Sequence, residues 1–93
     1  MLALELTPLS PRMVRGEVEE AARCLAELAK ASGSEVSVSY RAVGHDFKAS
    51  IMIRGDERAD IVRFVDRHLA GVIPPEYGGW GEFWIHEPEP KQD

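Results

Sequence analysis

The chain has 93 residues, 44% of them hydrophobic and 29% charged, and a formal net charge of −5. This size suits a single domain with one modest core, and no apolar run approaches the roughly 20 residues that span a bilayer, so we expect no membrane segment. The acidic balance argues against a general nucleic-acid-binding protein, which normally carries a basic surface. With one cysteine and no basic leader at its start, the chain is expected in the cytoplasm.

The first third of the chain predicts a strand followed by a helix. Leucine occupies every second position of residues 2–6, which is the period of a half-buried strand. Residues 10–11, Ser-Pro, are a typical helix start, and Gly33 follows the last apolar position of the helical pattern and fits a C-terminal cap. Gly16 weakens the first turns, so a start nearer Glu17 stays open.

The middle of the chain predicts a β-hairpin and a second helix. Residues 36–42 and 47–53 alternate between apolar and polar side chains on either side of the turn-forming stretch 43–46. An apolar helical stripe follows. Asp56 can cap the start of this helix, and Gly71 ends it.

The last part of the chain predicts a loop, a short strand and a tail. Residues 72–81 are rich in proline and glycine, and Phe83 and Ile85 alternate with polar or aromatic neighbours. From residue 72 onward five acids face one base, so this part carries four of the five net negative charges. We expect residues 87–93 to be an acidic, disordered tail and residues 1–86 to be a single α+β domain.

The order strand, helix, strand, strand, helix, strand predicts a ferredoxin-like βαββαβ two-layer sandwich. Right-handed crossovers place both helices on one face of an antiparallel sheet with strand order 4-1-3-2. The second and fourth strands are then the edges. The pattern resembles a fold and no particular family, and this fold hosts many unrelated functions.

The alternation assigns one face of that sheet to the helices and leaves the other face open. The side chains expected to face the helices are Leu2, Leu4, Val36, Val38, Phe47, Ile51 and Phe83. Those expected on the open face are Ala3, Glu5, Ser37, Ser39, Arg41, Lys48, Ser50, Met52, Arg54, Trp84 and His86. The three bases are suited to an anionic partner, and Trp84 is suited to anchor one.

The open face has alternative interpretations. Open sheets and free edges in a small domain favour self-association as a homodimer. The face can also be merely solvated, or covered by the acidic tail. Stacking of nucleic-acid bases would need aromatic residues on the two central strands, where the expected outward side chains include none.

Residues 77–84 form the most unusual stretch. Four of the seven aromatic residues lie here among three glycines. Tyr77, Trp80 and Trp84 are therefore candidate binding residues in an aromatic contact loop. Alternatively, Trp80 folds over the end of the core while Phe83 enters it.

Catalytic and metal-binding motifs are not evident. His45, His68 and His86 have no metal-ligand spacing, and we expect them to be solvent-exposed. Cys24 lies beside Arg23 with no histidine near it in sequence, which indicates a small, half-buried side chain.

Two arginines lie at the predicted start of the first helix. Arg12 and Arg15 are placed where an anion could bind, although two solvated side chains are the simpler interpretation.

These features favour a non-catalytic protein-interaction module, such as a small inhibitor, adaptor or immunity-type protein, without metal or cofactor. It would bind a protein partner or a second copy of itself through the open sheet face and residues 77–84. One alternative is a dimeric regulatory domain that binds a small molecule, with a small anion as a candidate ligand. The others are a cofactor-independent enzyme with His68 or His86 as base, and a nucleic-acid-binding protein.

Overall fold

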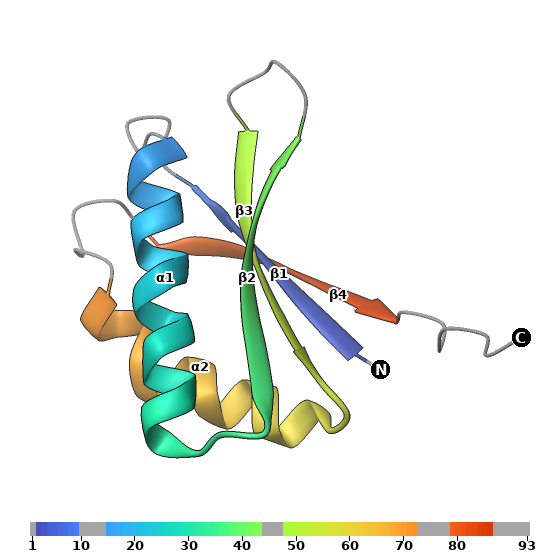
Figure 1. Cartoon of the computed structure of the whole chain (residues 1–93). Coiled ribbons are helices and arrows are strands. Elements are labelled where there is room, and N and C mark those ends of the chain that lie inside the picture. Colours follow the sequence, from blue (N-terminus) through green and yellow to red (C-terminus); the bar gives the residue numbers. More distant parts are fainter. Residues whose placement is uncertain (1, 10–14, 44–47, 73–78, 87–93) are drawn as a thin grey trace, which may run out of the picture.

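The computed structural model describes residues 2–9, 15–43, 48–72 and 79–86. In chain order the elements are β1 (Leu2–Pro8), α1 (Arg15–Ser32), β2 (Val36–Val43), β3 (Lys48–Gly55), α2 (Arg58–Val72) and β4 (Trp80–His86) (Figure 1). The predicted tail and most of the predicted hairpin turn lie outside the described residues.

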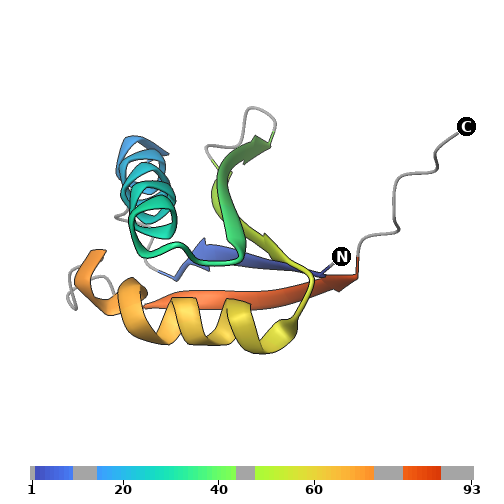
Figure 2. The ribbon, with the colours of Figure 1, turned by 60° about the horizontal axis from the view of Figure 1, so that its bottom comes forward.

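The four strands form one antiparallel sheet in the order β2-β3-β1-β4. This is the predicted order read from the opposite edge, so the predicted α+β class and strand order are confirmed. In Figure 2 the β2–β3 pair rises steeply from β1 and β4, because adjacent strands twist relative to each other. β2 and β4 are the two edges.

The hydrophobic core lies between one face of the sheet and both helices. Its sheet residues are Leu4, Leu6, Ala49, Ile51 and Ile53. Its helix residues are Val18, Ala21, Ala22, Leu25 and Ala29 from α1, and Ile61, Phe64 and Val65 from α2. Figure 1 shows α1 running alongside β2, and α2 crossing near the lower end of β2. Neither described helix is both long and apolar enough to cross a membrane.

Helix α1 is described from Arg15 onward, so Gly16 lies inside the helix and the start is not delayed to Glu17. The predicted start at residues 10–11 lies outside the described residues. At the other end the backbone N–H groups of Gly33 and Ser34 donate to the carbonyl oxygens of Lys30 and Ala29, at 3.3 and 3.0 Å. Gly33 has φ of 66°, which glycine adopts without strain, so the predicted C-terminal cap is confirmed as a Schellman motif.

Strand β4 is longer than the sequence pattern indicates. It begins at Trp80, whereas residues 72–81 were expected to be loop. Backbone pairing with β1 extends to the Pro8–Trp80 pair and includes Gly81 opposite Thr7. The predicted aromatic loop at 77–84 is thus wrong from Trp80 onward, because cross-strand pairing outweighs the low strand propensity of Gly81.

A glycine substitution tests the close packing of the sheet against α2. A Cβ atom on Gly55 would lie 3.2 Å from Ile61 Cγ1 and 3.3 Å from the carbonyl oxygen of Glu35. We expect Gly55→Ala to lower the free energy of unfolding by about 1–3 kcal/mol, because these buried atoms must shift. The measurement is urea unfolding followed by circular dichroism.

The matched control is Gly16→Ala. A Cβ atom there meets nothing within 4 Å, and Gly16 lies in a helix. This change should raise the free energy of unfolding, by up to about 1 kcal/mol. Equal stabilisation by both substitutions would contradict the packing described around Gly55.

Candidate interaction surface

The pairing of β4 with β1 decides which side chains lie on each face of the sheet. Residues directly opposite each other in an antiparallel sheet share a face. Trp84 is opposite Leu4, which is opposite the core residue Ile53. Trp84 therefore lies on the helix side.

The neighbouring row defines the open side of the sheet. Phe83 is opposite Glu5, which is opposite Met52, and all three lie on the face away from the helices. We call this the outer face. Its described side chains are Ala3, Glu5, Thr7, Ser37, Ser39, Arg41, Ser50, Met52, Arg54, Phe83 and Ile85.

The predicted orientation of β4 is wrong. Trp84 and His86 were expected on the outer face, and both lie on the helix side, since His86 is opposite Leu2. Phe83 was expected in the core, and its side chain is 56% exposed on the outer face. Side chains alternate between the two faces along β4, and each face receives two apolar residues that could be buried. Trp80 and Trp84 offer more apolar surface than Phe83 and Ile85, and the tryptophans occupy the core side.

Trp84 closes one part of the core. It packs against the core cluster, and the guanidinium carbon of Arg58 lies 4.4 Å from the centre of its ring. This geometry is a cation–π contact between β4 and the first turn of α2. The ring of Trp84 is thus half-buried on the helix side of the sheet, between the core and Arg58.

Trp80 lies on the same side of β4 as Trp84. It packs against the core cluster, as the alternative interpretation of this residue expected. Its indole Nε1 is buried and has no hydrogen-bond partner among the described residues. His86, at the other end of β4, is exposed.

The β2 side of the outer face carries a polar network. Ser50 Oγ donates to Glu5 Oε2 over 3.3 Å, and Arg41 Nη1 lies 3.6 Å from the same oxygen. Arg54 Nη1 donates to Ser39 Oγ over 2.9 Å. Arg41 and Arg54 lie on the predicted face, but both already have partners within the sheet.

The β4 side of the outer face is apolar. We call Ala3, Phe83 and Ile85 the apolar patch. Ala3, and Met52 in β3, are buried although they face away from the helices. Ile85 is half-buried, and Phe83 is exposed at the centre of the edge strand.

Several predicted site residues cannot be placed on this surface. Tyr77, Arg12 and His45 lie outside the described residues. The backbone of Lys48 pairs with Val43 at the end of the hairpin, and its side chain is outside the described part of the structure.

Arg15 lies away from the outer face. Its Nε donates to the Tyr40 hydroxyl over 3.4 Å, and Tyr40 packs against the core cluster. The contact joins the first turn of α1 to β2.

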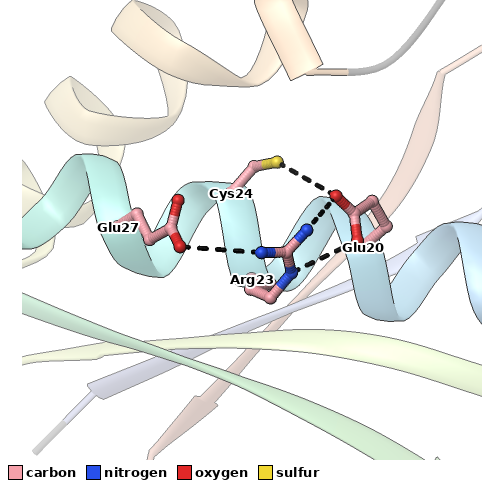
Figure 3. A network of polar contacts seen from close by, with 4 residues as sticks. All are labelled: Glu20, Arg23, Cys24 and Glu27. Carbon is pink, nitrogen blue, oxygen red and sulfur yellow. Dashed lines mark hydrogen bonds and ion pairs between the residues drawn. The ribbon is translucent and has the colours of Figure 1, made fainter.

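Cys24 belongs to a polar network on α1 (Figure 3). Its Sγ lies 3.9 Å from Glu20 Oε1 as a weak donor. Arg23 pairs with both Glu20 and Glu27. The hydrogen bond that Arg23 donates to Glu20, followed by the charges of Glu20 and Glu27, raises the pKa of Arg23. Arg23 is therefore occupied by carboxylates, and such exposed pairs contribute little to stability.

No group of three or more metal-ligating side chains occurs among the residues that the structure describes. No family model matches the chain, and no curated protein or solved structure resembles it significantly. The role of the outer face must be inferred from its own chemistry.

Paired substitutions in β4 test its orientation. We expect Trp84→Ala to lower the free energy of unfolding by about 2–4 kcal/mol, because it removes a large side chain from the edge of the core. Phe83→Ala should change it by less than about 1 kcal/mol, since that ring is mostly exposed. The measurement is urea unfolding at low protein concentration, and a larger loss for Phe83→Ala would show the opposite orientation.

Proposed function

We propose that this chain is a non-catalytic protein-interaction module of ferredoxin-like architecture, and that it pairs with a second copy of itself through the apolar patch. The single observation that carries the proposal is the 56% exposure of Phe83 on an edge strand. Aromatic residues in such positions are typical anchors of protein interfaces.

The outward side chains of β4 include none of the features that commonly keep an edge strand from associating with another chain. Natural edge strands commonly carry charges, prolines or bulges that prevent association. Here the outward residues of β4 are Gly81, Phe83 and Ile85, and the one acid in the strand, Glu82, shares the helix side with Leu6. Burial of Phe83 and Ile85 against another apolar surface removes both from water.

Twofold symmetry allows the apolar patch of one copy to meet the same patch of a second copy. An axis that lies between two facing sheets and runs perpendicular to the strands places the β4 side of one copy opposite the β4 side of the other. Phe83 and Ile85 then pack against the same two residues of the second copy, which removes both pairs from water.

The ferredoxin-like arrangement also supports this mode of pairing. Both helices pack on one face, so the other face is available to a second sheet. Two sheets pack face to face about 10 Å apart when their facing side chains interdigitate. A central aromatic ring surrounded by polar groups is the usual anatomy of such a contact.

Substitution of Phe83 tests this function. We expect the unmodified protein to be a dimer, and Phe83→Glu to raise the dimer dissociation constant at least about 30-fold, which corresponds to about 2 kcal/mol. Light scattering over a range of protein concentrations measures the mass.

The matched control is Val62→Glu, which places the same charge at an exposed apolar position on α2. This control should remain dimeric. A protein that is monomeric at all concentrations, or a Phe83→Glu variant that dimerises as tightly as Val62→Glu, would contradict the proposal.

A further inference from the structure

A cleft of about 230 Å³ lies between α2 and the loop that joins α1 to β2. One wall comes from the loop and includes Ser34 and Glu35. The other wall comes from α2 and includes Asp60, Arg63 and Arg67. The cleft is on the helix side of the sheet and shares no residue with the apolar patch.

The charges in this cleft are balanced but only partly paired. Arg63 Nη1 lies 3.7 Å from Asp60 Oδ1 within α2. The side chains of Glu35 and Arg67 have no ion pair or hydrogen bond among the described residues. The cleft therefore holds one unpaired negative group on the loop and one unpaired positive group on the helix.

This arrangement discriminates between classes of ligand. A simple anion at Arg67 would also meet the carboxylates of Glu35 and Asp60, and a simple cation at Glu35 would meet both guanidinium groups. A small molecule that carries both a carboxylate and an ammonium group complements both unpaired groups. We propose that the cleft binds a free α-amino acid, with its carboxylate on Arg67 and its ammonium on Glu35.

The backbone that carries Glu35 is held in place before any ligand binds. The Schellman motif at Gly33 and Ser34 fixes the start of the loop. A Cβ atom on Gly55 would lie 3.3 Å from the Glu35 carbonyl oxygen, so this part of the loop is packed against β3. A fixed loop reduces the entropy lost on binding.

The size and the aromatic part of the cleft also fit an amino acid. At about 230 Å³ the cleft is below the range of roughly 300–1,000 Å³ typical of sites for drug-sized ligands, which suits a smaller molecule. Phe64 and His68 also line it, and their ring centres are 4.9 Å apart. Phe64 provides the apolar part of this wall. His68, which was expected to be solvent-exposed, is half-buried, and its buried Nε2 has no hydrogen-bond partner among the described residues.

The test is an NMR titration of the ¹⁵N-labelled protein with each proteinogenic L-amino acid at millimolar concentration. We expect at least one to shift the amide signals of residues 32–35 and 60–68, with a dissociation constant in about the millimolar range because both charges are exposed. For that amino acid, the deaminated acid and the decarboxylated amine should each bind at least about tenfold more weakly.

Four variants separate this site from general charge effects. Arg67→Gln and Glu35→Gln should each weaken binding at least about tenfold. Arg23→Gln and Glu19→Gln, which remove the same charges from the exposed face of α1, should leave it unchanged. All four are surface changes, and the spectrum of each variant reports its fold.

Three results would overturn the proposal. One is that no amino acid shifts these signals. Another is that inorganic phosphate or the deaminated acid binds as tightly as the amino acid. The last is that Glu35→Gln binds the amino acid unchanged, which would mean a plain anion site.

Discussion

The alignment of Trp84 with Leu4 is the constraint on which both surfaces of the sheet depend. Side chains alternate along a strand, so one cross-strand pair fixes the orientation of every residue in β4. With Trp84 on the helix side, its ring covers part of the core and receives Arg58 from α2. The same alignment turns Phe83 outward, where the structure offers it no buried environment.

The two sides of the molecule consequently carry different chemistry. On the outer face, the central residue Glu5 divides a polar half, where Ser50 and Arg41 contact its carboxylate, from the apolar patch around Phe83. On the helix side, the cleft beside α2 carries unpaired charges of both signs. We propose the outer face for self-association and the cleft for a small ligand. Because the two regions share no residue, a dimer formed through the outer face would leave the cleft open.

Periodicity in the sequence predicted the two helices, the four strands and their order, because each element has a clear alternating or helical pattern. The same method failed at β4, where either Trp80 and Trp84 or Phe83 and Ile85 could face the core. The choice between the two pairs depends on a one-residue shift in the pairing of β4 with β1. It also could not predict that Arg41 would pair with Glu5, since these residues are far apart in sequence and meet only through the register of the sheet. The greater apolar area of two tryptophans was the available signal for the correct orientation.

The most direct test of the proposed interface is an isotope-filtered NOE experiment on a mixture of labelled and unlabelled protein. Such a spectrum records only contacts between the two copies. Self-association through the apolar patch predicts intermolecular NOEs from the Phe83 ring to the methyl groups of the patch. A dimer that shows intermolecular NOEs only elsewhere, or a protein that is monomeric at all concentrations and gives no intermolecular NOE, would contradict the account.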